Sequence, residues 1–132
     1  MRGYLLDTAI FLWSLEAPET LNRPALALLE DTTTELFLSA ASSWEIGIKS
    51  ALGKLRLPEA ASSYVPKRLT SQGIRSLPIS HIHALAAGEL PRHHADPFDR
   101  MLVAQARSED MVLMTADPSF KRYGIDILWC AR

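Results

Sequence analysis

Four acidic residues stand at the edges of apolar or amphipathic segments of this chain. They are Asp7, Glu45, Asp99 and Asp117. Two of them follow short apolar runs that end at the acid or just before it, and two lie near the starts of amphipathic segments. Carboxylates that are gathered together repel one another unless they are protonated or neutralised by cations, and hard divalent cations prefer oxygen ligands. If the fold brings the four acids together, they predict a magnesium or manganese site.

The elements that must position these acids alternate along the chain. Short apolar runs that are typical of strands cover residues 4–6, 36–39, 74–77, 111–114 and 127–129. Patterns typical of helices cover residues 9–15, 23–30, 42–55, 59–72, 80–87 and 97–109, and a short helix opens at 117–118. This alternation predicts an α/β fold, a three-layer α/β/α sandwich with a central, mainly parallel sheet. The carboxyl ends of such strands converge on one crevice, where we expect the acids to meet.

Length, charge and cysteine content narrow the class of protein. The 132 residues are close to the commonest domain size, so we expect a single domain over residues 1–132. The chain has 14 basic and 15 acidic residues, and this balance by itself does not indicate a nucleic-acid binder. Cys130 is the single cysteine, which excludes an intramolecular disulfide and fits a reducing compartment. No run approaches the roughly 20 apolar residues of a membrane span, and we expect a cytoplasmic protein.

Helix capping offers a purely structural explanation for some of these acids. Ser42 and Glu45 have the spacing of a capping box. Asp96 and Asp117 each precede a proline, as helix caps often do, and a cap typically stabilises a protein by about 1 kcal/mol. Asp7 is the acid that capping does not explain, because it ends a continuous apolar strand. Since two strands deliver an Asp near their carboxyl ends, the joint pattern favours a shared site over separate caps.

At these residues the chain resembles the PIN-domain ribonucleases, and within them the VapC-type toxins of bacterial toxin–antitoxin pairs. Four segments carry the resemblance in the family's order and cover essentially the whole chain. They read LLDT at 5–8, SAASSWEIGIK at 39–49, DPFDRMLVAQA at 96–106 and TADPSF at 115–120. The resemblance implies a PIN-like fold and a set of catalytic, metal-binding acids. These acids are Asp7, Glu45, Asp99 and Asp117.

The third segment contains two acids, and the choice between them rests on the resemblance. Asp99 is favoured, because it directly precedes the helical run 101–106 as the family's acid does. Asp96 then keeps a capping role, and a second role through a water molecule stays open. Thr8 and Thr115 are candidates for orienting a carboxylate or a metal-bound water, although a hydroxyl at a strand end is more often a turn partner.

The resemblance implies a Mg²⁺- or Mn²⁺-dependent endoribonuclease that hydrolyses RNA phosphodiester bonds and acts as the toxin of a toxin–antitoxin pair. It implies a cognate antitoxin as partner, together with a homodimer and a higher toxin–antitoxin assembly. The alternative is a non-catalytic PIN-like module that binds RNA or protein, and the presence of all four acids argues against it. Phosphatases and phosphotransfer receivers also carry acids at strand ends, but a receiver would need an acidic pair near Asp7.

The basic residues, some apolar residues and the histidines give weaker indications of function. Basic residues expected around the crevice are Lys49, Lys54, Arg56, Lys67, Arg68, Arg92 and Arg100, and Lys49 is also spaced to pair with Glu45. Apolar residues of the first two helices, which fit a partner surface and the monomer core equally well, are Phe11, Leu12, Trp13, Leu15, Leu26, Leu28 and Leu29. The histidines are His81, His83, His93 and His94, whose spacing favours surface or capping roles over zinc, and only weakly suggests a phosphate contact by His94.

Overall fold

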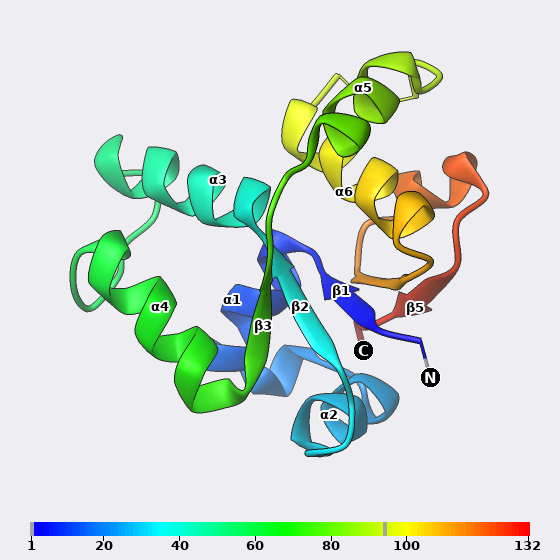
Figure 1. Cartoon of the computed structure of the whole chain (residues 1–132). Helices are drawn as coiled ribbons and strands as arrows, with labels where there is room; N and C mark the ends of the chain where they lie inside the picture. The colour runs from blue at the N-terminus through cyan, green and yellow to red at the C-terminus, as the bar shows by residue number, and fades with distance from the viewer. Residues whose placement is uncertain (1, 94) are drawn as a thin grey trace.

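The computed structural model describes residues 2–93 and 95–132 and shows strands alternating with helices (Figure 1). The strands found there are β1 (Tyr4–Leu6), β2 (Leu36–Ser39), β3 (Ile74–Leu77), β4 (Val112–Thr115) and β5 (Ile127–Trp129). The α-helices found there are α1 (Thr8–Glu16), α2 (Arg23–Glu30), α3 (Ala40–Ala51), α4 (Ala61–Gln72), α5 (His81–Glu89) and α6 (Pro97–Ser108). Two 3-10 helices, η1 (Pro18–Thr20) and η2 (Pro118–Tyr123), complete the described elements.

The strands form one parallel sheet in the order β3-β2-β1-β4-β5. The chain runs from β1 outward to β2 and β3, and then returns to place β4 on the other side of β1. Strand order therefore reverses between β1 and β4, which creates a topological switch point at their carboxyl ends. Asp7 follows β1 directly and Asp117 lies two residues beyond the end of β4, so the sheet places these acids on either side of that point.

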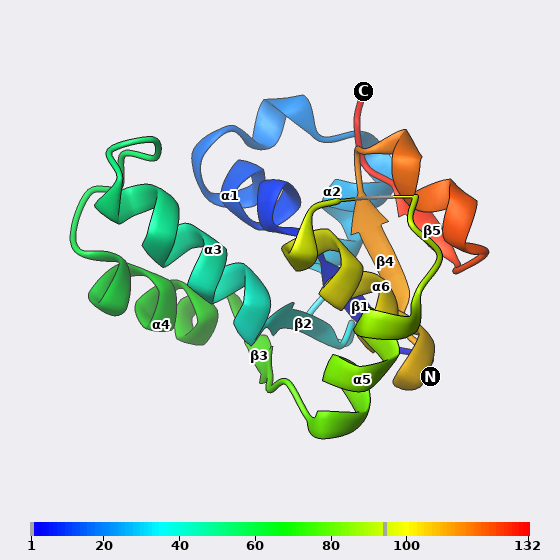
Figure 2. The same cartoon turned by 90° about the horizontal axis from the view of Figure 1, so that it is seen from above.

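Neighbouring residues of the strands point to opposite faces of the sheet and enter two separate cores. On β1, Leu5 packs in the cluster that includes buried residues of α5 and α6, whereas Leu6 packs in the cluster that includes residues of α1, α2 and α4. Leu113 and Met114 of β4 divide between the same two clusters. Figures 1 and 2 show these helix groups on the two sides of the sheet. The predicted three-layer α/β/α sandwich with a parallel sheet is confirmed.

Helix α3 begins earlier than the sequence predicts. Ser39, the last residue of β2, is also the N-cap of α3, and its hydroxyl accepts a hydrogen bond from the Ala41 N–H at 3.0 Å. Because β2 passes into α3 without a loop, Ser42 and Glu45 lie inside the helix. The predicted capping box of Ser42 and Glu45 is therefore wrong, and the Glu45 side chain is left to make contacts across the fold.

The other capping assignments differ in outcome. Asp7 is the N-cap of α1, and its Oδ1 accepts a hydrogen bond from the Ile10 N–H at 2.8 Å, so the prediction that capping does not explain Asp7 is wrong. Asp96 caps α6 by accepting from the Phe98 and Asp99 N–H groups at 2.8 and 3.3 Å. Asp117 caps η2 through the Ser119 N–H at 3.0 Å. The last two assignments are confirmed.

Several large apolar side chains of the described residues are exposed, and most of them lie in or close to α3 and α5 rather than in the first two helices. They are Trp44, Leu52, Ile79, Ile82, Leu85 and Trp129. Phe11 is buried, and other apolar residues of α1 and α2 are partly buried against the core. These two helices thus contribute chiefly to the monomer core. Among the described residues, no helix is both long and apolar enough to cross a membrane.

Candidate functional site

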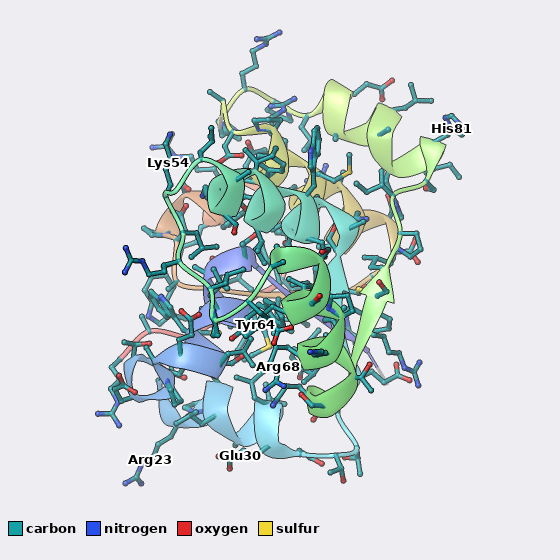
Figure 3. All side chains as sticks on the ribbon, turned by 90° about the vertical axis from the view of Figure 1, so that its left-hand side faces the viewer. Arg23, Glu30, Lys54, Tyr64, Arg68 and His81 are labelled. Atoms are coloured by element: carbon teal, nitrogen blue, oxygen red, sulfur yellow. The ribbon has the colours of Figure 1, made fainter. Side chains whose placement is uncertain are left out.

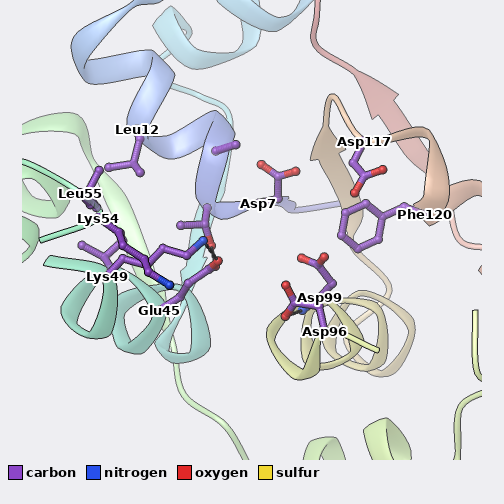
Figure 4. A pocket seen from close by; sticks show the side chains of 13 residues that line it. Asp7, Leu12, Glu45, Lys49, Lys54, Leu55, Asp96, Asp99, Asp117 and Phe120 are labelled. Carbon is purple, nitrogen blue, oxygen red and sulfur yellow. Dashed lines mark hydrogen bonds and ion pairs between the residues drawn. The ribbon is translucent and has the colours of Figure 1, made fainter. Parts of the chain in front are cut away.

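A cavity of about 450 Å³ opens at the carboxyl ends of β1 and β4 (Figure 4). The described residues that line it are Asp7, Thr8, Ala9, Leu12, Glu45, Ile46, Lys49, Lys54, Leu55, Asp96, Asp99, Asp117 and Phe120. The structure therefore brings all four predicted acids to one cavity, together with Asp96. Figure 4 shows the carboxylates of Asp7, Asp99 and Asp117 turned toward the same space, with Glu45 and Lys49 on another wall.

Asp7 is fixed at both of its carboxylate oxygens. Oδ1 accepts from the Ile10 N–H in the first turn of α1, and Oδ2 accepts a short hydrogen bond from the Thr115 hydroxyl at the end of β4. The same hydroxyl accepts from the Asp117 N–H at 3.0 Å. Thr115 therefore links the acid after β1 to the acid after β4 across the switch point. Its predicted role in orienting a carboxylate is confirmed.

Glu45 is held in the second turn of α3 by two side chains from different parts of the chain. Its Oε1 accepts from the Thr8 hydroxyl at 2.6 Å, and its Oε2 lies 2.6 Å from Nζ of Lys49, one helical turn later. Thr8 Oγ1 is also 2.9 Å from the hydroxyl of Ser42. The expected role of Thr8 and the expected Glu45–Lys49 pair are both confirmed. Glu45 is buried, with 7% of its surface exposed.

Asp99 reaches the cavity from the first turn of α6, where the Asp96 cap and the following proline fix the start of the helix. Helix N-termini carry a partial positive charge from their unpaired N–H groups, which favours nearby carboxylates. Helices α1 and α3 start directly after β1 and β2, at the carboxyl ends of these strands. Helix α6 starts at the same edge, where Asp96 and Asp99 line the cavity. The partial positive charge at these helix starts thus offsets some of the negative charge of the acids.

That compensation is incomplete for Asp7 and Asp99, whose raised pKa values mean that their carboxyl groups retain protons more readily than free ones. Burial raises the pKa of Asp7 to about 6, against the lowering effect of its hydrogen bonds from Thr115 and Ile10, and the charges of Asp117 and Glu45 add to the rise. Burial also raises the pKa of Asp99 to about 7, with further increases from Asp96 and the other acids. Uncompensated negative charge is therefore concentrated in the cavity.

A hard divalent cation suits this set of donors. Carboxylate oxygens are the ligands that Mg²⁺ and Mn²⁺ prefer, and the raised pKa values of Asp7 and Asp99 indicate a need for positive charge. Within the described residues, no three His, Cys, Asp or Glu side chains are close enough to hold an ion by themselves. This wide spacing is compatible with Mg²⁺, which keeps several of its waters and takes few carboxylates. The residues present fit such an ion.

Of the basic residues expected around the crevice, Lys49 and Lys54 line the cavity. Arg100 instead donates to main-chain carbonyls, including those of Ala87 and Leu90, and Lys67 pairs with Glu59. Arg68 lies 5.9 Å from the ring centroid of Tyr64, and Figure 3 shows both on or near α4 and away from Lys54. Most of the predicted positive charge therefore serves local structure or solvent-facing surfaces.

The histidines give little support to a zinc site among the described residues. His83 is buried, accepts from the Ser80 N–H through Nδ1 at 3.1 Å, and places Nε2 2.9 Å from Glu109. It belongs to the capping box of α5, so the predicted capping role is confirmed for this histidine. The contact suggested for His94 falls outside the described residues.

The apolar walls of the cavity were missed by sequence reasoning. Leu12 and Leu55 lie on one side and Phe120 of η2 lies beside Asp117 (Figure 4). Leu12 and Leu55 occur in segments whose patterns predict helices, and Phe120 contributes to the core. The sequence carries no separate signal that their edges face a cavity.

Comparison with known proteins identifies the family of this chain. A model of the PIN domain family matches residues 4–126. The chain belongs to the PIN domain family. The ribonuclease VapC16 of Mycobacterium tuberculosis (strain ATCC 25618 / H37Rv) is 46% identical to it over 57 residues, which is 43% of this chain and 40% of that relative. The chain thus aligns with less than half of the length of this curated relative.

Solved structures of other proteins share the PIN fold over almost the whole chain. A structure of VapBC2 from Rickettsia felis bound to a promoter DNA fragment has a TM-score of 0.71 at 19% identity, covering 96% of this chain and 98% of that one. FitAcB from Neisseria gonorrhoeae gives 0.66 at 21% identity over 95% and 96%, respectively. VapBC-1 from nontypeable Haemophilus influenzae gives 0.65 at 18% identity over 96% of both chains. At these identities the similarity supports the fold.

The raised pKa values predict how the stability of the metal-free protein depends on pH. The folded chain keeps protons on Asp7 and Asp99 up to about pH 6 and 7, whereas an Asp in the unfolded chain loses its proton near its ordinary pKa of 3.8. Between those limits the folded state binds more protons, so these groups make the protein less stable as pH rises. For Asp7 alone the loss is on the order of 1–3 kcal/mol, at about 1.36 kcal/mol per pKa unit.

Urea unfolding in EDTA at pH 5 and pH 8 measures this effect. Other ionisable groups also titrate in that range, so the comparison is with Asp7→Asn, which keeps a side chain that can cap α1. The variant should gain more stability over the wild type at pH 8 than at pH 5, because at pH 5 the folded state still holds most of the Asp7 proton and only part of the loss has occurred. An equal difference in unfolding free energy at both pH values would mean that the buried charge of Asp7 does not destabilise the fold.

Proposed function

We propose that this PIN-domain protein is a metal-dependent endoribonuclease that hydrolyses RNA phosphodiester bonds in the cavity at the switch point. The observation that carries the proposal is the gathering of Asp7, Glu45, Asp99 and Asp117, distant in sequence, around one cavity in a chain of this family. The name of the relative VapC16, a ribonuclease, supports RNA as the substrate. We further propose that the four acids are the catalytic, metal-binding residues.

Hydroxyl groups of two threonines support two of the four acids in this proposal. Thr115 and the Ile10 N–H hold Asp7 with both oxygens oriented, and the side chain lines the cavity. Thr8 orients Glu45 in the same way. A divalent cation, Mg²⁺ or Mn²⁺, supplies a water of lowered pKa and stabilises negative charge on the phosphate when it is bound among these carboxylates. Lys54, at the rim, is placed to attract the RNA backbone.

We propose that Asp96 is mainly a structural acid. Its Oδ1 accepts from two N–H groups at the start of α6, which orients the helix and hence Asp99. Its charge still lines the cavity and raises the pKa of Asp99. The cap accounts for the position and orientation of this side chain, and a role in holding the ion through water is compatible with them.

Cleavage assays on matched Asp→Asn variants test this function. Purified wild type should cut single-stranded RNA with Mg²⁺ or Mn²⁺ and should be inactive in EDTA. Asp7→Asn and Asp99→Asn should each lose more than the roughly 10- to 100-fold that loss of a supporting group around a metal typically costs. Asp96→Asn is the control, because Asn retains the cap and should leave most of the activity.

Two outcomes of that assay would contradict the proposal. RNA binding by the wild type with no cleavage under any metal condition would favour the alternative, a non-catalytic PIN-like RNA-binding module. Loss of activity in Asp96→Asn with wild-type activity in Asp99→Asn would mean that the acid of the third motif has been misassigned. Circular dichroism at the assay temperature checks that every variant is folded.

We propose that the chain is a toxin restrained by a cognate antitoxin. A structural neighbour that is described as a toxin-antitoxin complex from Klebsiella pneumoniae, with a TM-score of 0.59 at 17% identity, supports this proposal. A ribonuclease toxin and its RNA substrate would meet in the cytoplasm, so the cytoplasmic location stays part of the prediction. Antitoxin binding at the acids would compete with a divalent ion, because an arginine inserted among carboxylates supplies the same charge.

We expect the chain, when purified from its native host, to carry a small DNA-binding protein in stoichiometric amount. Titration of Mg²⁺ into that complex should weaken it, and replacement of Asp7, Glu45, Asp99 and Asp117 by Ala should reduce the affinity measured by isothermal titration calorimetry. An antitoxin that binds the wild type and this quadruple variant equally well would show that its inhibition does not depend on the acids.

We propose that the exposed apolar side chains of α5 form part of a homodimer interface. Ile82 and Leu85, one helical turn apart, are 72% and 69% exposed, and Ile79 just before the helix is 39% exposed. Apolar side chains that gather on one surface, rather than singly, often mark an interface. Such a dimer is also a step toward the higher toxin–antitoxin assembly expected from the resemblance.

Sedimentation velocity of the isolated chain tests the homodimer. The wild type should sediment as a dimer, and Ile82→Glu combined with Leu85→Glu should sediment as a monomer. Both side chains are mostly in solvent, so the double variant should stay folded, with the circular dichroism spectrum of the wild type. A wild type that stays monomeric at micromolar concentration would remove the support for this interface.

A further inference from the structure

Lys49 places a cation inside the acidic cavity by direct contact with one of the four acids. Its Nζ lies 2.6 Å from Oε2 of Glu45, and the dashed lines of Figure 4 mark this pair on the wall opposite Asp117. The other oxygen of Glu45 accepts from Thr8 at 2.6 Å. Both oxygens of this carboxylate are therefore already engaged by groups of the chain itself.

The ammonium also interacts with acids beyond its immediate partner. The pKa of Lys49 is raised chiefly by its hydrogen bond to Glu45, and the charges of Glu45, Asp96 and Asp99 contribute further. Five carboxylates and two lysines line the cavity among the described residues. The second lysine, Lys54, takes part in none of the ion pairs found in that part of the chain. Both lysines thus line the cavity, but only Lys49 forms an ion pair with one of its acids.

We propose that Lys49 is an internal counter-ion of the site, which competes with the divalent cation for Glu45 and thereby lowers the affinity of the cavity for that cation. The proposal rests on the metal-dependent function proposed above. An ammonium that donates to Oε2 occupies a lone pair and neutralises a charge that an incoming cation would otherwise use. Lys49 acts through Glu45 and is therefore a positioning residue.

The two side chains differ in mobility in the way that replacement of Lys49 by a divalent cation requires. Glu45 is buried and fixed by Thr8, so it stays in place, whereas the Lys49 side chain is 49% exposed and has a flexible stem that can turn into solvent. An ordinary pair one helical turn apart on a surface contributes little, because water screens both charges. In this pair only the cation has ready access to water. Release of Lys49 therefore leaves a buried carboxylate that demands another cation.

Manganese binding, measured without RNA, tests this role independently of cleavage. Isothermal titration calorimetry of Mn²⁺ into the full chain should give a dissociation constant about three- to tenfold lower for Lys49→Met than for the wild type, as expected when a partly buried competing charge is removed. Lys54→Met is the matched control, since it removes a charge from the same cavity without breaking the Glu45 contact. Its dissociation constant should change by less than about twofold. Lys49→Arg, which keeps the charge, should bind Mn²⁺ no more tightly than the wild type.

The melting temperature supplies a second readout. Lys49→Met should melt below the wild type in EDTA, because Glu45 has lost its counter-ion, and saturating Mn²⁺ should raise its melting temperature by more than it raises that of the wild type. A variant that melts low but gains no more than the wild type would have only a structural defect, which contradicts the proposal.

Other outcomes separate this proposal from the function on which it rests. Equal tightening by Lys49→Met and Lys54→Met would mean that only the overall field matters, and weaker binding by Lys49→Met would mean that Lys49 assists the ion; either result overturns the proposal. If the wild type cleaves RNA with Mn²⁺ but Lys49→Met binds the ion unchanged, the function stands and the counter-ion role fails. If none of the four proteins binds Mn²⁺, the proposed metal-dependent function itself is rejected.

Discussion

Repulsion among carboxylates at one edge of the sheet is the constraint around which this structure is organised. Burial raises the pKa of both Asp7 and Asp99, and each also responds to the charges of the other acids in the cavity. Charged groups are not gathered in this way by packing alone, because removing them from water is unfavourable. The fold must therefore hold the acids in place against their own repulsion.

Three kinds of contact do this, and all come from the chain itself. Hydroxyl groups of Thr8 and Thr115 each donate to a carboxylate from a neighbouring element. Main-chain N–H groups at helix starts donate to Asp7, Asp96 and Asp117. The ammonium of Lys49 neutralises Glu45. The hydroxyl contacts span two elements and the N–H contacts fix helix starts, so the groups that orient the acids also hold strands and helices together, whereas the Lys49–Glu45 pair lies within α3.

The parallel sheet explains why residues so distant in sequence meet. With the order β3-β2-β1-β4-β5, the chain leaves β1 and β4 in opposite directions, and the space between their carboxyl ends stays uncovered. Asp7 and Asp117 enter it from strands, while Glu45 and Asp99 enter it from helices that start at the same edge. The position of the cavity follows from the strand order, whereas its chemistry depends on a few side chains.

The sequence predicts the strands and the set of acids at the cavity well, and it predicts local connections less well. The segments predicted as strands match β1, β2, β3 and β5 to the residue. The runs of β1 and β2 are mostly apolar because these parallel strands are largely buried, whereas β3 has exposed Arg75 and Ser76 between two buried apolar residues. The start of α3 was misplaced because Ser39 ends a strand and caps a helix at once, and no turn residue separates the two. The single-domain assignment and the catalytic role of the acids stay predictions, since a static fold does not test them.

Asp7 illustrates why a capping explanation and a chemical one need not exclude each other. One oxygen of its carboxylate caps α1 and the other accepts from Thr115, yet an uncharged Asn could make comparable contacts without the cost of a buried charge. Capping therefore accounts for the position and orientation of the side chain but not for its charge. The same reasoning applies to Glu45, whose place inside α3 requires no acid for the helix to form. Local structure does not require the negative charges of Asp7 and Glu45, and these charges are what would bind a cation in the cavity.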